Sequence, residues 1–304
     1  MAPATFSDRL YNSIREKNSV LCVGLDPRWE LLPLDLRNSC HGLGLEKIAR
    51  SYSNFCSEVI DIVAPYVPVV KPQSAFFEAC GAAGILALGA VIDHARSKGL
   101  LVILDAKRGD ISTTGEAYAK TAFTGADYEG QHYSLFAADS LTVNPYLGED
   151  SLEPFLTEAE KVQGGIFVLL RTSNPGSGLF QNLICEGKPL YYHVADAISR
   201  WNYVTIRSHG YGSIGAVVGA TNPRDLKELR SYMPGVWFLV PGYGAQGGTA
   251  EDVRESFDDN GFGAIVNSSR GITFCFKPDS KDWKAAIRLA VEKTNQQLNA
   301  VRSR

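Results

Sequence analysis

Four charged side chains of alternating sign follow apolar runs of the chain and could share one site. Asp105 and Lys107 are two residues apart, and residues two apart on an extended chain project to the same face. Lys71 ends another apolar run and could flank Asp105, while Asp110, at the next turn, could flank Lys107. Because each charge would have an opposite neighbour, all four could remain ionised in a partly buried site. Fixed charges of this kind can stabilise charge that develops during a reaction.

Each of these residues also has an ordinary structural interpretation when it is taken alone. Asp110 could supply turn or N-cap chemistry for the following helix. Lys71 could be a surface lysine before a proline, and the dipeptide Asp26-Pro27 is common in turns. The joint pattern, in which every charge stands where a predicted strand ends, favours a functional site.

A second group of polar residues, near the end of the chain, could bind an anion such as phosphate. Glycines at positions 242, 244, 247 and 248 would let the backbone approach an anion and present N–H groups to it. Arg270 adds a cation with fork geometry, and Gln246 adds a neutral donor. The alternative is a tight loop beside a surface arginine. The loop also matches the dinucleotide-binding fingerprint, but it follows the seventh β unit, and no acid at the end of a strand stands at the expected offset.

Short apolar and β-branched runs alternate with longer helical patterns along the whole chain. The candidate strands are Ser19–Leu25, Val67–Lys71, Leu100–Asp105, Ser140–Asn144, Gly165–Leu170, Ile214–Val218, Val236–Val240 and Ala264–Asn267. Helical periodicity marks Leu45–Val63, Ile85–Lys98, Leu152–Val162, Leu190–Trp201, Pro223–Tyr232, Thr249–Phe257 and Lys281–Leu298.

This alternation predicts an α/β protein with parallel strands and helical crossovers. An eightfold repeat favours a closed (β/α)8 TIM barrel over an open sheet, and no linker divides the chain, so we expect a single barrel domain over residues 1–304. Barrel active sites lie at the carboxyl ends of the strands, and phosphate often binds after strands seven and eight. The connections Asp26–Gly44 and Arg171–Pro189 leave this end and are unusually long, which makes them lid candidates.

The composition excludes several classes of protein. The net charge is −3 and no basic strip is interleaved with aromatics, so nucleic acid is not an expected partner. No apolar stretch is long enough to span a membrane, and the first residues lack a secretory or transit pattern. The six cysteines form no regular framework and are expected to be free thiols in the cytoplasm. The histidines lack metal-ligand spacing, so no metal site is predicted.

The strand-end residues resemble those of a known family. Asp105-x-Lys107-x-x-Asp110-Ile111 is similar to the signature of the orotidine 5′-monophosphate decarboxylases. The agreement includes Lys71, Pro241-Gly242-x-Gly244-Ala245-Gln246-Gly247-Gly248 and Ser269-Arg270, in register with the predicted strands. The Asp-x-Lys-x-x-Asp motif alone also occurs in a wider group of barrel phosphosugar enzymes. Lys71 on strand two, together with Asp26 on strand one, narrows the resemblance.

The resemblance implies decarboxylation of orotidine 5′-monophosphate to uridine 5′-monophosphate, the last step of pyrimidine synthesis, without metal or cofactor. It implies that Lys107 protonates the ring carbanion, that Asp105 lies against the substrate carboxylate, and that Lys71 pairs with Asp105 and a ribose hydroxyl. It further implies a homodimer with shared active sites. The remaining implied contacts are Asp110 and Thr114 from the neighbouring subunit to ribose, Asp26 to ribose, Ser173 to the pyrimidine, Gln246 and Arg270 to phosphate, and Ile111, Pro241 and Ser269 within the substrate site.

Two points stay open at the level of sequence. The two long connections resemble those of a longer-chain subgroup, which leaves open whether Thr172, Ser173 or Asn174 meets the pyrimidine. The rival functions are a metal-dependent aldolase or decarboxylase of a phosphorylated keto sugar and a non-catalytic barrel that binds a phosphate ligand. A dinucleotide-dependent oxidoreductase is the least favoured.

Overall fold

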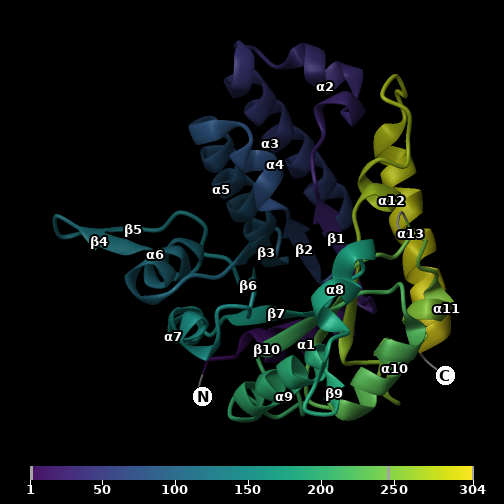
Figure 1. The fold of residues 1–304 in the computed structure, drawn as a ribbon. Helices are drawn as coiled ribbons and strands as arrows, with labels where there is room; N and C mark the ends of the chain where they lie inside the picture. Colours follow the sequence, from purple (N-terminus) through teal and green to yellow (C-terminus); the bar gives the residue numbers. More distant parts are fainter. Residues whose placement is uncertain (1–2, 245–246, 303–304) are drawn as a thin grey trace.

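Eight parallel strands close into a barrel in the computed structural model of the chain, which describes residues 3–244 and 247–302 (Figure 1). The first strand pairs with the last, with Leu21 opposite Val266, so the barrel has no open edge. Around the barrel the order is β1, β12, β11, β10, β7, β6, β3 and β2. The strands are β1 (Leu21–Leu25), β2 (Val69–Pro72), β3 (Leu101–Arg108), β6 (Ser140–Val143), β7 (Gly165–Arg171), β10 (Ile214–Val218), β11 (Phe238–Val240) and β12 (Ala264–Ser268).

Each predicted strand forms one of these barrel strands, and the predicted (β/α)8 fold is confirmed. Every residue of β1, β2, β6, β10, β11 and β12 is buried, which explains why their sequences are continuous apolar runs rather than alternating ones. The largest difference at a boundary concerns β3, which continues three residues beyond its predicted end at Asp105, to Arg108.

Helices pack around the barrel and bury their apolar stripes against it (Figure 1). In α3, for example, Tyr52, Phe55, Val59 and Ile62 are buried at the spacing of one helix face. The crossover helices are α3 (Gly44–Val63), α5 (Gly81–Ser97), α6 (Ser112–Ala122), α7 (Glu153–Lys161), α9 (Leu190–Tyr203) and α10 (Pro223–Tyr232), and α13 (Trp283–Arg302) follows the last strand. The segment predicted as one helix at Thr249–Phe257 contains α11 (Ala250–Val253) followed by the 3-10 turn η4 (Arg254–Ser256).

An N-terminal helix that the sequence pattern did not predict, α1 (Phe6–Lys17), lies against the amino-terminal end of the barrel. Phe6 packs edge-on against Phe167, and Arg9 forms an ion pair with Asp139, which directly precedes β6. Thr5 and Asp8 form a capping box that fixes where the helix begins. The helix therefore covers the end of the barrel opposite to the predicted site.

The long connections contain short elements of their own. The segment after β1 holds η1 (Trp29–Leu31) and α2 (Leu34–Ser39), and the segment after β7 holds η3 (Pro175–Ser177), α8 (Gly178–Gln181) and the hairpin of β8 (Ile184–Cys185) with β9 (Lys188–Pro189). A second hairpin, β4 (Ala126–Tyr128) with β5 (Gln131–Tyr133), projects away from the barrel beyond α6 (Figure 1). The remaining elements are α4 (Ser74–Glu78), η2 (Glu149–Ser151) and α12 (Arg270–Thr273).

All six cysteines are free thiols, as their spacing predicts, and four of them are buried. Among the helices of residues 3–244 and 247–302, none combines the length and apolarity that a bilayer span requires.

Candidate active site

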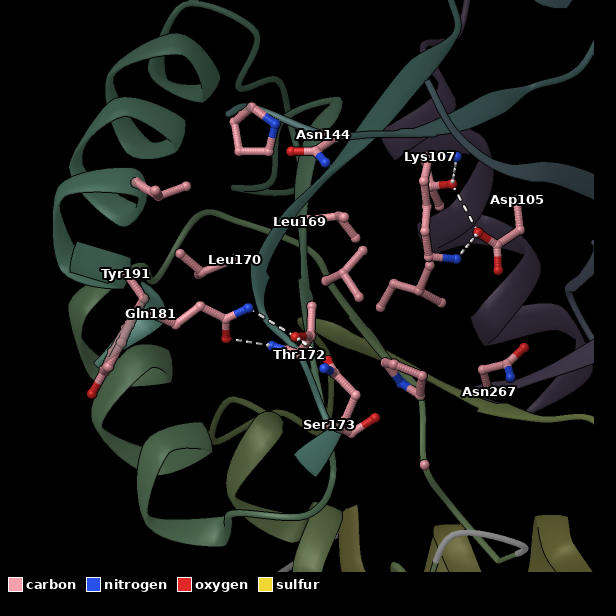
Figure 2. Close-up of a pocket in the computed structure, with 18 of the residues that line it drawn as sticks. Asp105, Lys107, Asn144, Leu169, Leu170, Thr172, Ser173, Gln181, Tyr191 and Asn267 are labelled. Carbon is pink, nitrogen blue, oxygen red and sulfur yellow. Dashed lines mark hydrogen bonds and ion pairs between the residues drawn. The ribbon is translucent and has the colours of Figure 1, made fainter. Parts of the chain in front are cut away.

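A cavity of about 900 Å³ opens at the carboxyl ends of the barrel strands. Asp105 and Lys107 lie on one side of it, and Gln181 and Tyr191 lie across from them (Figure 2). Its lining comes from β1, β2, β3, β6, β7, β10, β11 and β12 or from the segments that follow them. The cavity therefore lies where barrel enzymes have their active sites.

The carboxylate of Asp105 is the centre of a charge cluster in this cavity. Its Oδ2 accepts hydrogen bonds from Lys71 Nζ at 2.5 Å and Gln73 Nε2 at 3.1 Å. Its Oδ1 accepts hydrogen bonds from Lys107 Nζ at 2.6 Å and Thr142 Oγ1 at 2.9 Å. The side chain is 8% exposed, so these donors replace the water that a carboxylate would otherwise bind.

Asp105 and Lys71 hold each other in their ionised forms. Burial alone would raise the pKa of Asp105, but the ammonium groups of Lys71 and Lys107 outweigh it and lower the pKa below its ordinary value. Burial alone would lower the pKa of Lys71, but Asp105 and Asp26 outweigh it and raise the pKa. Beneath them burial raises the pKa of the Cys22 thiol to about 12, so this group stays neutral.

Lys107 reaches the cluster through an irregular backbone. Asp105 and Lys107 meet, as their spacing predicts, but Lys107 is not extended: its φ is +48°, in the left-handed region. The pairing of β3 with β6 shifts register between Leu104 and Arg108. The Lys107 side chain is 46% exposed, whereas that of Lys71 is 5% exposed. The two ammonium groups on Asp105 are therefore different: one is buried, and the other is accessible from the cavity.

The fourth charge of the predicted cluster lies apart from the other three. Asp110 is not among the residues that line the cavity, and its Oδ1 accepts a hydrogen bond from the N–H of Ile111. Ile111 is the N-cap of α6 and receives no side-chain cap, so Asp110 does not cap this helix. Ile111 and Thr114 are exposed at the start of α6, also outside the cavity lining.

The ends of β1 and β12 bring three further polar side chains to the cavity. Asp26, Asn267 and Ser269 all line it. Asp26 Oδ1 and Asn267 Oδ1 are buried and make no hydrogen bond within the described residues, so both oxygens can accept one from a ligand. The Ser269 hydroxyl occupies the space beside Gly24, where a Cβ would approach the Ser269 Oγ to 1.9 Å. Gly24 is thus required for this close approach.

The segment after β7 folds back over the cavity. Gln181 accepts a hydrogen bond from the Thr172 N–H at 3.0 Å and donates one to the Thr172 hydroxyl at 2.8 Å (Figure 2). The Thr172 hydroxyl in turn donates to Asn174 Oδ1 at 2.7 Å. Ser173 lies against Gly219, where a Cβ would come within 2.7 Å of the Ser173 Cβ. Thr172, Ser173 and Asn174 all line the cavity.

The predicted phosphate loop after β11 has the expected backbone conformation and different hydrogen bonding. Gly242, Gly244 and Gly247 have positive φ angles of 99°, 75° and 93°. However, the N–H groups of Gly244, Gly247 and Gly248 donate to carbonyls of the same loop, and so they do not point at an anion here. Pro241 and Gly242 line the cavity. Gln246 lies outside the described residues.

Arg270, the other residue predicted to bind phosphate, is exposed at the start of α12. It directly follows Ser269, which lines the cavity. Arg270 itself is not among the residues that line the cavity.

Thr142 and Gln73 both donate to Asp105, and neither was predicted as a site residue from the sequence. Thr142 carried a signal, because it is, with Ser140, one of two polar residues in a fully buried strand of the barrel. Gln73 directly follows Pro72 at the end of β2, and nothing in its sequence environment distinguishes it from a loop residue.

The donor set at the centre of the cavity contains two ammonium groups on one carboxylate. A metal ion at Asp105 would have to displace Lys71, which is buried and already paired. Within the described part of the chain, no group of three or more His, Cys, Asp or Glu side chains is arranged to hold a metal ion.

The fold and the site together define a closed (β/α)8 barrel with an aspartate between two lysines at the carboxyl ends of its strands. Each carboxylate oxygen of this aspartate accepts two hydrogen bonds. The chain belongs to the orotidine 5′-phosphate decarboxylase / HUMPS family, whose family model matches residues 19–285.

Known proteins resemble the chain over nearly its whole length. Orotidine 5′-phosphate decarboxylase from Rhodopirellula baltica is 48% identical over 301 residues, which cover 97% of this chain and 99% of the relative. The structure of OMP decarboxylase from Leishmania donovani matches with a TM-score of 0.74 at 33% identity, covering 98% of both chains. The structure of UMP synthase from the same organism matches with a TM-score of 0.78 at 34% identity; it covers 99% of this chain, which spans 57% of that longer one.

Proposed function

We propose that this protein decarboxylates orotidine 5′-monophosphate to uridine 5′-monophosphate, a step of pyrimidine biosynthesis. The observation that carries the proposal is the ionised Asp105 held between the ammonium groups of Lys71 and Lys107 inside a cavity. Membership of the family and the names of the relatives support the same reaction.

In the proposed reaction, the bond between the pyrimidine ring and its carboxylate breaks, carbon dioxide leaves, and the electron pair stays on the ring carbon. Lys107 then donates a proton from Nζ to that carbon and regains one from water. Its partial exposure to the cavity suits this role, since the proton donor must reach the substrate. Lys71 is buried and paired, and so it serves to keep Asp105 ionised.

Asp105 would face the substrate carboxylate. Two like charges about 4 Å apart repel by about 4 kcal/mol at an effective dielectric constant of 20, and loss of carbon dioxide removes this repulsion. The ammonium of Lys107 meanwhile attracts the developing carbanion. Both effects favour the transition state over the bound substrate, which is the condition for catalysis.

The remaining residues would bind the nucleotide. We assign Asp26 to the ribose, because one of its buried carboxylate oxygens has no partner within the described residues. We assign Ser173 to the pyrimidine, because it lines the cavity on the segment that follows β7 and the family resemblance gives it this contact. Pro241 and Ser269 also line the cavity and would contact the nucleotide. Gln246 and Arg270 would hold the phosphate, whose binding far from the reacting carbon can help to close the loops.

We also propose a homodimer in which each subunit completes the other's site. Asp110, Ile111 and Thr114 lie outside the cavity lining of their own chain, and Ile111 and Thr114 are exposed. In a C2 dimer the same surface serves both subunits, so each could supply these residues to its partner. An equal mixture of Lys107→Ala and Asp110→Ala subunits would then regain activity in about one quarter of its sites, because half of the dimers would carry one intact site. Absence of any recovery would contradict the shared site.

We expect one barrel domain to carry this activity in the cytoplasm, where nucleotide substrates and free thiols are both found. The catalytic proposal is tested by following the ultraviolet absorbance of orotidine 5′-monophosphate after chelator-treated protein is added. We expect full turnover without metal or cofactor. Activity that disappears on chelation would instead favour the metal-dependent phospho-keto-sugar enzyme, and no turnover under any condition would favour a non-catalytic barrel.

A further inference from the structure

The irregularity in β3 is closed by a single side-chain hydroxyl from the neighbouring strand. β3 and β6 pair regularly up to Leu104 opposite Leu141, and pairing resumes with Arg108 opposite Val143. Three residues of β3, at positions 105 to 107, therefore stand opposite Thr142 alone. Such a bulge leaves N–H groups of the longer strand without ladder partners.

Thr142 supplies the missing acceptor. Its Oγ1 accepts the N–H of Ala106 and the N–H of Lys107, both at 3.0 Å. A hydroxyl oxygen has two lone pairs and one proton, so these two bonds use its acceptor capacity. The proton is left to donate to Asp105 Oδ1, at 2.9 Å. Thr142 is 1% exposed, so water does not compete for these bonds.

From this geometry we propose that Thr142, which lies in the cavity wall, is a positioning residue that acts through Asp105 and Lys107. The inference rests on the proposed decarboxylation. One hydroxyl fixes the carboxylate of Asp105 and the backbone that carries Lys107, and thereby sets the position of the ammonium relative to the carboxylate.

The backbone at Lys107 needs such support. A residue with a side chain in the left-handed region costs about 1–2 kcal/mol relative to the right-handed one, and Lys107 has a φ of +48°. Conformations of this kind persist only where the surroundings hold them. Without the hydroxyl, the N–H groups of Ala106 and Lys107 would both lose their acceptor, and the segment could relax toward ordinary extended pairing.

The test compares Thr142→Val, which replaces the hydroxyl by a methyl group of similar size, with Thr142→Ser, which retains the hydroxyl. We expect kcat for orotidine 5′-monophosphate to fall about 100-fold in the valine variant, the size of effect caused by a misplacement of roughly 1 Å. The dissociation constant of uridine 5′-monophosphate, measured by calorimetry, should stay within about threefold, since its proposed contacts lie elsewhere. The serine variant should recover kcat to within about threefold of the parent.

A matched control deletes an equivalent hydroxyl at the opposite end of the barrel. Thr205 Oγ1 accepts the N–H of Ser213 at 2.9 Å and donates to the Asn202 carbonyl at 2.8 Å. Thr205→Val should lower the melting temperature and leave kcat unchanged. If Thr142→Val does not fold, Thr142→Ala removes the same hydroxyl without adding bulk and is measured in the same way.

The possible results distinguish a failure of the proposed role of Thr142 from a failure of the proposed decarboxylation. A wild-type kcat in the valine or alanine variant would overturn the positioning role. So would a serine variant as slow as the valine variant, or a loss of product affinity that equals the loss of kcat, since both indicate general disruption. A parent protein that never turns over orotidine 5′-monophosphate would overturn the proposed function itself, and the inference with it.

Discussion

The two ends of the barrel both contain buried charges but use them differently. At the amino-terminal end, Asp139 pairs with Arg9 and accepts the Val102 N–H at 2.9 Å, and Arg230 donates to the carbonyls of Gly263 and Met233. At the carboxyl end, Asp105 bonds only side chains, two of them ammonium groups, and faces a cavity.

This difference separates a structural charge from a functional one. The amino-terminal charges form hydrogen bonds with backbone groups that folding would otherwise leave unpaired. None of Arg9, Asp139 and Arg230 lines the cavity at the carboxyl end. At the carboxyl end, Lys71 and Lys107 pair with Asp105, so a ligand can change these contacts without leaving a backbone group unpaired. A buried ion pair alone therefore does not identify a site; what its members bond to and whether they face a cavity do.

The largest expected effect is the loss of turnover when the exposed ammonium group of Lys107 is removed. Lys107→Ala should lower kcat by about 10⁴-fold, the upper end of what a positioned general acid contributes, because this group also balances the charge of Asp105. Turnover of orotidine 5′-monophosphate measures the effect. Lys161 is a matched control, since it is likewise partly exposed and its Nζ lies 2.6 Å from the buried Glu158 carboxylate, the same distance as in the Lys107 pair. Equal turnover in the two alanine variants would rule out Lys107 as proton donor.

The next effect compares the two ends directly through stability. Asp105→Ala leaves the buried Lys71 without its principal partner, and the free energy of unfolding should fall by about 3–5 kcal/mol. Asp139→Ala leaves the Val102 N–H unpaired and should cost about 1–3 kcal/mol. Denaturant titration measures both. Only the first variant should lose turnover, and a loss of kcat in folded Asp139→Ala would remove the distinction between the two ends.

The smallest effect is a pH dependence of the unfolding free energy that comes from Asp105 at the carboxyl end of the barrel. Lys71 and Lys107 hold the pKa of Asp105 below the ordinary value of 3.8, so its contribution to stability is present above that pH and is lost as the pH falls through the lower folded pKa. The difference in unfolding free energy between the parent and Asp105→Asn should be constant from neutral pH to about pH 4, then shrink by about 1 kcal/mol near pH 3. A difference that already shrinks between pH 7 and pH 5 would mean that the carboxylate is not held by the two lysines.

The sequence predicted the barrel because burial of both strand faces leaves continuous apolar runs that helical patterns separate. It predicted that Lys71, Asp105 and Lys107 meet because strand ends converge on one rim in this fold. Thr142 could not be assigned as a donor to Asp105, because that requires the register of β3 against β6 and the shift within it.

Other features depend on contacts between distant segments and leave no local pattern. The left-handed conformation of Lys107 is not signalled by its residue type. The close approaches of Gly24 to Ser269 and of Gly219 to Ser173 join residues that are far apart in the chain. The N–H groups of the loop after β11 were expected to face an anion, but their internal hydrogen bonds follow from how that loop closes.

The pairing of β1 with β12 has a consequence for synthesis on the ribosome. β1 is synthesised early, but β12, which pairs with one edge of β1, is complete only at Ser268. Until then one edge of β1 and one edge of β11 have no partner strand, and unpaired edges are templates for pairing with other chains. A chain that terminates before β12 would keep unpaired edges permanently, so we expect such products to be insoluble and to depend on chaperones for their clearance.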